Sequence, residues 1–423
     1  MSPERWLRIE SVFQTAIDLP ATDRDSFLAD ECGQDAELRG EVEKLLKSSD
    51  SAAAFIEVPV WTDSRFLNTS AKKEISNSLE DQFEDAVRDN YLGSRIGAYR
   101  LTREIGRGGM GAVYLAERAD GEFNQQVAIK LVKRGMDSDF IIRRFRHERQ
   151  ILASFEHPFI ARLLDGGTTA DAVPYFVMEF IRGESLYDYC DNKKLAVRDR
   201  LKVFQKVCSA IEYAHERQII HRDIKPSNIL INRTGSPKLL DFGIAKILDP
   251  NLVHESINPT ASMLRMMTPD YASPEQVEGV DISPSSDIYS LGILLYELLT
   301  GHRPYNFEGR ALHEVSRVIA EVTPELPSRM LGLKEQLLPK YTGSENRAMD
   351  ARSTTPSELG QALSGDLDDI LMKAISKSPA DRYRSAKELS RDISRYLSGA
   401  KIEAPRFSAK QQRVRRDSLL QVR

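Results

Sequence analysis

The chain has 423 residues, of which 41% are hydrophobic and 29% charged, with a formal net charge of −4 and a pI of about 6.1. This composition supports a large folded core, and it lacks the overall basic field expected of a nucleic-acid-binding protein. The three cysteines lie far apart without CxxC spacing, which predicts reduced thiols in a cytoplasmic protein. The sequence contains neither a signal-like apolar N-terminus nor an apolar run of about 18 residues, so we expect no transmembrane segment.

Residues 1–60 have the pattern of a small helical unit. Apolar side chains from Trp6 to Ile17 recur at helical spacing, and Thr22 followed by Asp25 resembles a helix-capping box. Residues 61–95 are polar and partly acidic, which is typical of a linker.

From Ile96 onward the pattern changes to strand-like alternation with glycines, and after residue 185 it changes again to long helical runs. This order predicts an α+β fold with two lobes, a β-rich lobe over 96–185 and an α-rich lobe over 186–400. The apolar run from Ile288 to Leu299 predicts a core helix. The polar stretch from about Val322 to Leu363 predicts a long surface insertion.

Residues 401–423 form a basic tail with seven Lys or Arg residues. A solvated helix end is one interpretation of this tail. Weak contact with an anionic membrane surface is another, and a third is that the tail continues into a longer chain.

A glycine-rich motif, Gly106, Gly108 and Gly111 followed by Val113, has the spacing G-x-G-x-x-G-x-V. Backbone without β-carbons can approach phosphates closely and donate its N–H groups to them. Dinucleotide-binding folds use the same spacing, but they place it between a strand and a helix. Here Val113 to Ala116 reads as a second strand, which favours a phosphate-binding hairpin, with a turn of no function as the alternative.

A lysine and a glutamate follow at a suggestive spacing. Lys130 ends the apolar run Val127 to Ile129, and Glu148 lies eighteen residues later on a predicted helix. A lysine that holds the α- and β-phosphates of a nucleotide needs a carboxylate to fix its position, and Glu148 is the candidate. Each could instead be an ordinary solvated charge.

The run from His221 to Asn228 carries the strongest signal. Asp223 can accept the proton of a substrate hydroxyl, Lys225 can stabilise a transferring γ-phosphoryl group, and Asn228 can offer an oxygen to Mg²⁺. Thirteen residues later Asp241 begins an Asp-Phe-Gly motif, and its carboxylate is the candidate ligand for the Mg²⁺ that bridges the phosphates, whereas Asn228 would bind a second Mg²⁺.

Together these motifs resemble the eukaryotic-like serine/threonine protein kinases of bacteria over about Ile96 to Leu397. The resemblance implies a bilobal kinase fold that transfers the γ-phosphoryl group of ATP to Ser/Thr hydroxyls of proteins in cytoplasmic signalling, with Mg²⁺ or Mn²⁺ as the metal. Lys225 beside Pro226 resembles the serine/threonine branch. The implied catalytic residues are Asp223, Lys225, Lys130, Glu148 and Thr268. The implied ATP contacts are Ile105, Gly106, Arg107, Gly108, Gly109, Gly111, Val113, Ala128, Lys130, Met178, Glu179, Ile181 and Leu230. The implied metal ligands are Asn228 and Asp241.

Further residues resemble the structural positions of that family. Ser273 to Glu275 resembles its Ala-Pro-Glu motif, Asp287 its helix-anchoring aspartate and Arg382 the arginine that pairs with Glu275. The family usually has Gly-Thr before the substrate-facing turn, whereas this chain has Met267-Thr268-Pro269. The Thr268 hydroxyl would bridge Asp223 and Lys225.

Regulation and rival functions stay open at this point. A phosphate on Thr260 or Ser262 could pair with Arg222 and order the segment after Asp241, although these hydroxyls could equally be merely solvated. The rivals to a protein kinase are a pseudokinase that acts as a scaffold or nucleotide sensor, and a kinase of small molecules. The presence of every catalytic residue type disfavours the first. Dimerisation is neither required nor excluded by the sequence.

Overall fold

The structure is a computed structural model, and the chain divides into two units, Met1–Asp89 and Asn90–Arg423. It describes residues 91–108, 111–132, 153–171, 173–242, 269–280, 282–307, 309–330, 352 and 354–407, together with residues 12, 27–28, 31–32, 35, 38–40 and 42. In the N-terminal unit, five described residues are helical and buried against one another: Val12, Leu28, Cys32, Leu38 and Val42. The rest of residues 1–42, all of residues 43–60 and the predicted linker up to residue 90 lie outside the described part.

The larger unit begins with a six-stranded antiparallel sheet of order β1-β2-β3-β4-β6-β5. Its strands are β1 (Arg95–Ile96), β2 (Tyr99–Gly108), β3 (Gly111–Arg118), β4 (Gln126–Val132), β5 (Leu163–Thr168) and β6 (Pro174–Glu179). Alternate residues of β3 are buried, namely Ala112, Tyr114 and Ala116. Period-two burial is what a half-covered strand requires, and it gives this sheet its own small core.

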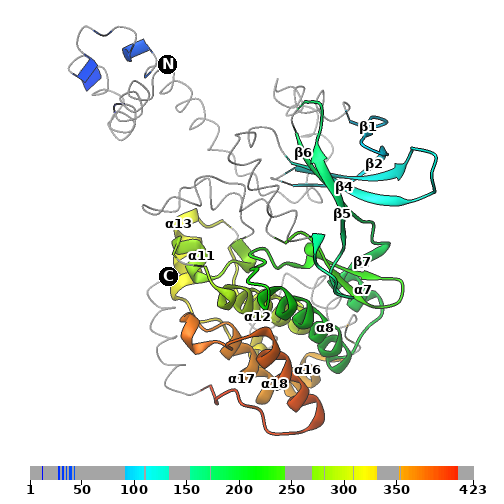
Figure 1. The fold of residues 1–423 in the computed structure, drawn as a ribbon. Helices are drawn as coiled ribbons and strands as arrows, with labels where there is room; N and C mark the ends of the chain where they lie inside the picture. Colours follow the sequence, from blue (N-terminus) through cyan, green and yellow to red (C-terminus); the bar gives the residue numbers. More distant parts are fainter. Residues whose placement is uncertain are drawn as a thin grey trace, which may run out of the picture. The chain divides into compact units, whose positions relative to one another are not determined.

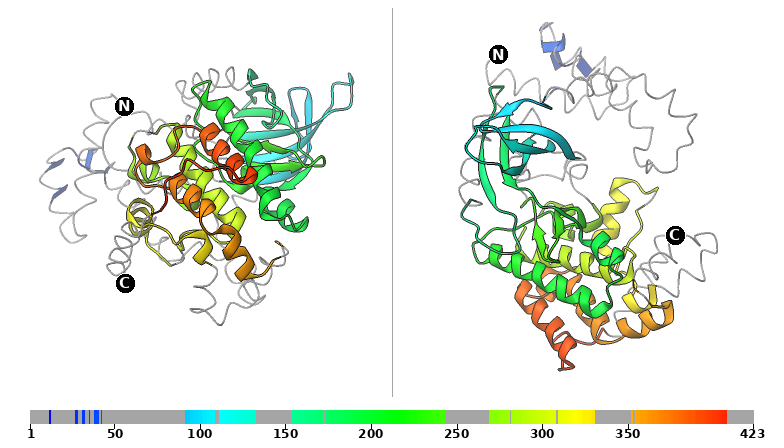
Figure 2. Two further views of the ribbon diagram at one scale, coloured as in Figure 1. Left: turned by 90° about the horizontal axis from the view of Figure 1, so that it is seen from below. Right: turned by 90° about the vertical axis from the view of Figure 1, so that its right-hand side faces the viewer.

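Helices dominate the rest of the larger unit, and the views of Figures 1 and 2 place them at the end away from the six-stranded sheet. They are α7 (Leu186–Asn192), α8 (Val197–His215), α11 (Pro274–Glu278), α12 (Pro284–Thr300), α13 (Leu312–Glu321), α16 (Pro356–Leu363), α17 (Asp366–Ala374) and α18 (Ala386–Ser398). The short 3₁₀ turns are η1 (Pro226–Asn228), η3 (Pro269–Tyr271) and η4 (Pro379–Asp381). A three-stranded sheet of order β7-β8-β9 (Gly183–Ser185, Ile229–Asn232 and Pro237–Leu239) lies beside them. The α+β fold with two lobes is confirmed.

Helix α12 is the central element of the helical lobe. Ser283 caps its N-terminus by accepting a hydrogen bond from Ser285 N, and Gly301 ends it with a left-handed φ of 77°. It is buried along nearly its whole length, against α8 and α17 among others. The predicted core helix from Ile288 to Leu299 is therefore confirmed.

The predicted surface insertion over Val322 to Leu363 is wrong at both of its ends. Val322 and Leu326 are buried, and a capping box at Thr355 starts helix α16. The polar composition concealed two short apolar patterns that pack on the main core. Arg352 is also buried, and it donates to the carbonyls of Leu298 and Leu299 at the end of α12. Residues 331–351 lie outside the described part.

The chain after α18 is held against the helical lobe. Gly399 ends α18 with a left-handed φ, and the N–H groups of Glu403 and Ala404 then donate to the carboxylate of Asp392. Phe407 N donates to Asp369 on α17. The start of the predicted basic tail is thus fixed, and residues after 407 lie outside the described part. Among the described helices, none is both long enough and apolar enough to cross a membrane.

Candidate active site

The glycine-rich motif forms a hairpin. Gly108 on β2 pairs with Gly111 on β3, so the motif joins two antiparallel strands instead of a strand and a helix. Gly111 has φ of 140°, and a β-carbon there would lie 1.9 Å from the carbonyl oxygen of Leu131. Only glycine permits this approach of the hairpin to β4. The hairpin is the arrangement that separates this motif from a dinucleotide-binding fold, as the sequence indicated.

Lys130 comes from β4 and contacts the Asp-Phe-Gly aspartate. Its Nζ lies 2.9 Å from Asp241 Oδ2, and the two side chains are 13% and 24% exposed. The sheet thus delivers one ammonium group to the carboxylate that the helical lobe supplies. Glu148, the predicted partner of Lys130, lies outside the described residues.

The loop after α8 brings three predicted residues together. Asp223 Oδ2 lies 2.9 Å from Lys225 Nζ and accepts a hydrogen bond from Asn228 Nδ2 at 3.0 Å. Asn228 Nδ2 also donates to the backbone carbonyl of Asp223 at 2.8 Å. The single 3₁₀ turn η1 returns Asn228 toward Asp223, and Pro226 at its start fixes the φ that the turn needs.

Arg222 has an unusual backbone conformation, and both of its peptide groups are held. Its φ is 65°, a left-handed value that costs about 1–2 kcal/mol in a residue with a β-carbon. Asp287 Oδ1 accepts from Arg222 N at 2.9 Å, and Gln276 Nε2 donates to Arg222 O at 2.9 Å. This turn directs Asp223, the next residue, and it depends on a side chain of α12 and another of α11.

Asp287 is the main anchor of the catalytic loop. Its Oδ2 accepts from His221 N and lies 2.7 Å from His215 Nε2. Burial alone would raise the pKa of Asp287, but the hydrogen bond and charge of His215 and the N–H of His221 lower it below the ordinary value. The group therefore carries a full negative charge and accepts from all three donors.

An aromatic cluster with edge-to-face and tilted ring contacts, which the sequence analysis missed, joins the catalytic loop to the Asp-Phe-Gly segment. The ring of Phe242 lies 4.7 Å from that of His221 and 5.3 Å from that of Phe155. His221 Nε2 is 3.0 Å from Leu240 O, and burial lowers the pKa of His221. The imidazole is therefore neutral and enclosed, and it packs against the ring next to Asp241 without adding a charge there. The sequence motifs contain His221 and Phe242, but apart from the aromatic character of Phe155 no sequence feature indicated that it would cluster with them.

Several of the predicted ATP contacts occupy neighbouring positions of the six-stranded sheet, and another lies on β8. Val113 pairs with Lys130, and Ala128 pairs with Met178. Leu230 follows Asn228 by two residues on β8. The Arg107 side chain, another predicted ATP contact, forms a two-point pair with Glu104. Two more predicted ATP contacts lie on β2: Ile105 is exposed, and a β-carbon added at Gly106 would have no atom within 4 Å. Glu179 is the last residue of β6, and Ile181 follows it by two residues.

Comparisons with known proteins agree with this geometry. Residues 99–392 match the protein kinase domain. The chain belongs to the protein kinase family.

The similar curated proteins are bacterial serine/threonine-protein kinases. The chain is 36% identical over 321 residues to serine/threonine-protein kinase PrkC of Bacillus subtilis, covering 75% of this chain and 43% of that protein. It is 33% identical over 314 residues to serine/threonine-protein kinase PknB of Mycobacterium tuberculosis, covering 73% and 44%. The chain thus spans less than half the length of these relatives. A crystal structure of the Mycobacterium tuberculosis PknI kinase domain aligns with a TM-score of 0.49 at 23% identity, covering 72% of this chain and 97% of that one.

The kinase has two side chains suited to a divalent cation. Asp241 Oδ1 is buried and has no hydrogen-bond partner among the described residues. Asn228 uses its amide nitrogen for Asp223, which leaves its oxygen for another contact. Carboxylate and amide oxygens are the ligands that Mg²⁺ prefers, and an orphaned buried carboxylate oxygen calls for a cation. These residues therefore fit the metal that the family uses.

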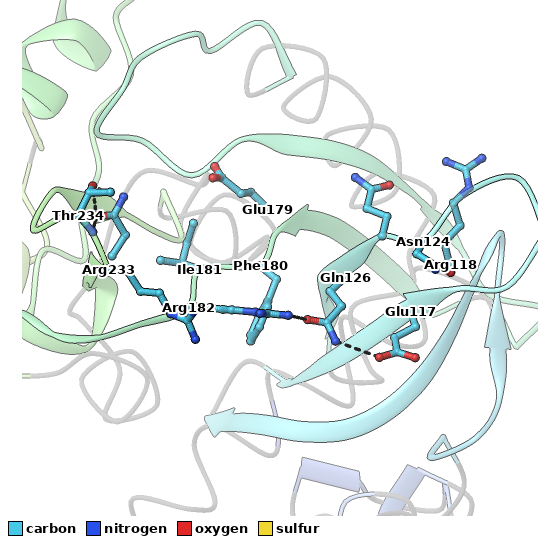
Figure 3. Close-up of a pocket in the computed structure, with 12 residues that line it drawn as sticks. Glu117, Arg118, Asn124, Gln126, Glu179, Phe180, Ile181, Arg182, Arg233 and Thr234 are labelled. Atoms are coloured by element: carbon cyan, nitrogen blue, oxygen red, sulfur yellow. Dashed lines mark hydrogen bonds between the residues drawn. The ribbon is translucent and has the colours of Figure 1, made fainter.

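The kinase also has a hollow of about 780 Å³ on the outside of the connection between its lobes (Figure 3). Arg182 donates to Gln126 and Gln126 donates to Glu117, forming a chain of hydrogen bonds along its floor. Glu179 binds Lys238 at 3.1 Å, which links β6 to β9. None of the described catalytic residues lines this hollow.

Five predicted site residues lie outside the described part of the kinase. They are Gly109, Glu148, Thr268 and the two phosphorylation candidates Thr260 and Ser262. The structural positions inferred from the family are brought together as expected, since Glu275 and Arg382 form a buried ion pair.

Proposed function

We propose that the kinase transfers the γ-phosphoryl group of ATP to Ser/Thr hydroxyls of proteins. The observation that carries this proposal is the contact of the Asp223 carboxylate with both Lys225 and Asn228. A base, a cation and an oxygen ligand within one loop are the groups that phosphoryl transfer to a hydroxyl needs. Lys225 beside Pro226 and the serine/threonine kinases at 33–36% identity support a Ser/Thr acceptor.

In this mechanism Asp223 accepts the proton of the substrate hydroxyl while the hydroxyl oxygen bonds to the γ-phosphorus, and the bond from that phosphorus to the β–γ bridging oxygen breaks to release ADP. Lys225 stabilises the negative charge on the transferring group, and Lys130 positions the nucleotide phosphates. Asp241 and Asn228 would hold Mg²⁺, which supplies charge neutralisation to the phosphates when bound. Mn²⁺ prefers the same oxygen ligands and would substitute. Asp287 keeps the strained loop in place, so that Asp223 needs no reorganisation during the reaction.

We further propose that the kinase phosphorylates its own segment between Asp241 and Glu275. Thr260 and Ser262 are the candidate acceptors, and Arg222 is the cation that would bind the phosphate. Replacing Thr260 and Ser262 together by alanine should lower the rate of phosphate transfer. An unchanged rate would mean that phosphorylation of these two residues does not activate the kinase. Mapping phosphosites by mass spectrometry decides this point.

The setting that we propose is the cytoplasm, where ATP is available and thiols stay reduced. No disulfide joins the described cysteines Cys32, Cys190 and Cys208, and all three are buried, which supports such a compartment. Protein substrates are the proposed partners. We propose no nucleic-acid partner, and only weak membrane contact through the basic tail.

The test is transfer of labelled phosphate from ATP and Mg²⁺ to the kinase itself and to a generic protein substrate. Asp223→Asn should abolish transfer while preserving ATP binding, measured as a thermal shift. Asp199→Asn is the matched control, because Asp199 is a surface residue that is 52% exposed and, among the described residues, forms its ion pair with its helix neighbour Lys202. Equal transfer by wild type and Asp223→Asn would overturn the mechanism. ATP binding without any transfer would instead favour a pseudokinase scaffold.

A further inference from the structure

A cluster of charges lies beside the turn that precedes α11. Arg303 Nη1 binds Asp270 Oδ1 at 2.8 Å, and Arg303 Nε lies 3.4 Å from Glu297 Oε1. Asp270 belongs to η3, the turn that the sequence places toward the protein substrate, and Glu297 belongs to the last turns of α12. One guanidinium group therefore serves two carboxylates from different elements.

The carboxylate of Glu297 is fixed by two phenols as well. Tyr271 donates to Glu297 Oε2 at 2.5 Å, and Tyr187 donates to the same oxygen at 3.1 Å. Burial and the Glu297 charge raise the pKa of Tyr271, so its phenol stays protonated and remains a donor. Ser290 holds the backbone of Tyr271 by donating to its carbonyl at 2.8 Å. The cluster is consequently part of the rigid frame of the helical lobe.

Arg303 is the member of this cluster that reaches the surface most. Its side chain is 48% exposed, compared with 22% for Asp270 and 15% for Glu297. With Arg303 present, the three groups carry a net charge of −1. Without it they would carry −2 at a surface from which a cation could approach. The position of the guanidinium therefore decides how strongly this surface attracts basic side chains.

The cluster lies within reach of a peptide bound at the catalytic loop. Asp287, which anchors that loop, and Glu297 are ten residues apart on α12, a rise of about 15 Å along the helix. An extended peptide advances about 3.3 Å per residue. About five residues of extended peptide would span this distance. A long side chain on the peptide covers part of it, so a peptide residue roughly three to five positions from the acceptor would come near Arg303.

We propose that Arg303 is a specificity-determining residue that masks Asp270 and Glu297, so that a basic side chain roughly three to five residues from the acceptor favours a substrate less than it would if the two carboxylates were unmasked. This inference rests on the proposed protein kinase activity. It concerns the choice of substrate and leaves the chemistry at Asp223 unchanged. The guanidinium repels a like charge that the carboxylates would otherwise attract.

The experiment compares two peptides that carry one serine and differ only by arginine or glutamine, placed in turn at three, four and five residues on each side. The measured quantity is the ratio of kcat/KM for the arginine peptide to that for the glutamine peptide. For Arg303→Met we expect this ratio to rise about tenfold at one or two of these positions, and to fall again at high salt. Arg303→Lys, which keeps the charge, should stay close to wild type.

Arg317→Met is the matched control. The Arg317 side chain is 49% exposed and faces Glu321 at 3.9 Å on α13, so it resembles Arg303 in exposure but serves only one carboxylate on its own helix. Its peptide ratio should equal that of wild type. An equal rise in this variant would show a general charge effect and would overturn the specific role of Arg303.

A second variant tests the inference even if Arg303→Met does not fold. Asp270→Asn removes one negative charge and leaves the cluster neutral, so the ratio should fall below the wild-type value. Ratios that stay unchanged at every position in both Asp270→Asn and folded Arg303→Met would overturn the inference alone. Failure of the wild-type kinase to phosphorylate even the glutamine peptides would overturn the proposed function, and the inference with it.

Discussion

Arg382 forms a two-point ion pair with Glu275, with distances of 2.7 and 2.9 Å, across 107 residues of sequence. The two side chains are 0% and 5% exposed. The same guanidinium also donates to the carbonyls of Ser285, Ser376 and Lys377. One side chain therefore ties together α11, the start of α12 and the segment after α17, which are the elements behind the substrate-facing turn.

Loss of Arg382 should destabilise the kinase strongly. Arg382→Met would leave the Glu275 carboxylate buried without its partner, and we expect the free energy of unfolding to fall by about 3–5 kcal/mol. Urea unfolding followed by circular dichroism measures this change. Arg317→Met, which breaks an exposed pair, should change the same quantity by less than about 0.5 kcal/mol. A loss of similar size in both variants would contradict the role of the buried pair.

Asp287 should affect turnover more than nucleotide binding. Asp287→Asn has one acceptor oxygen in place of two, so it cannot satisfy His215 and the N–H groups of His221 and Arg222 together. The strained Arg222 turn would relax and displace Asp223, and we expect kcat to fall about 100-fold.

Kinetic constants for wild type and Asp287→Asn, with Asp199→Asn as the surface control, check this prediction. The KM for ATP should change little, because Lys130 and the glycine hairpin belong to the sheet. A variant whose KM for ATP rises while kcat is retained would show that Asp287 acts on the nucleotide site instead.

The site was predictable where its residues are close in sequence. The run from His221 to Asn228 is one loop, and local turn chemistry is enough to bring Asp223, Lys225 and Asn228 into contact. The place of Asp241 in the site, as a candidate metal ligand, was also predictable from its motif. Its contact with Lys130, by contrast, crosses 111 residues and depends on how the two lobes close, which no local pattern encodes.

The fold was predictable in class and less so in detail. Strand-like alternation followed by helical periodicity predicted the two lobes. The apolar run from Ile288 to Leu299 predicted that α12 lies in the core of the helical lobe. The burial of Arg352 could not be foreseen, because an arginine in a polar stretch normally lies at the surface. It donates to the carbonyls at the end of α12 and lies 3.8 Å from the Asp191 carboxylate, and these partners come together only after the helices have packed. The pairing of Arg303 with Asp270 also crosses elements that no local pattern brings together.

Gly292 should be required for the packing of α12 on α17. A β-carbon at this position would lie 2.6 Å from Ile375 Cγ2 and 2.9 Å from Ala374 Cβ. Alanine favours a helix by about 1 kcal/mol over glycine, but overpacking a close contact costs about 1–3 kcal/mol. We therefore expect Gly292→Ala to lower the free energy of unfolding despite its better helix propensity.

A double-variant cycle checks the cause of that loss. Ala374→Gly removes one of the two atoms in conflict, so Gly292→Ala combined with Ala374→Gly should be more stable than the sum of the two single changes indicates. Additive losses in denaturant unfolding would mean that the α12–α17 contact adapts to the extra methyl group.

Lys377 should make the stability of the kinase depend on pH. Its Nζ donates to Tyr305 OH at 2.7 Å and to Ile319 O, with the Tyr289 ring nearby, and no carboxylate of the described residues pairs with it. Burial, with a smaller contribution from the charge of Arg382, lowers the pKa of Lys377 from 10.5 to about 7. Between these two values the unfolded chain binds a proton that the folded kinase does not, so stability should rise with pH.

The comparison is between wild type and Lys377→Met, unfolded with urea at several pH values from 6 to about 10. Above pH 7, the free energy of unfolding of wild type should rise by up to about 1.4 kcal/mol per pH unit relative to the variant. Below pH 7 the difference should stay constant, because Lys377 is protonated in both the folded and the unfolded state. Lys202→Met, at a side chain that is 62% exposed, should follow wild type throughout. Parallel curves for wild type and Lys377→Met would show that the ammonium group stays charged in the fold, held by Tyr305 and the Ile319 carbonyl.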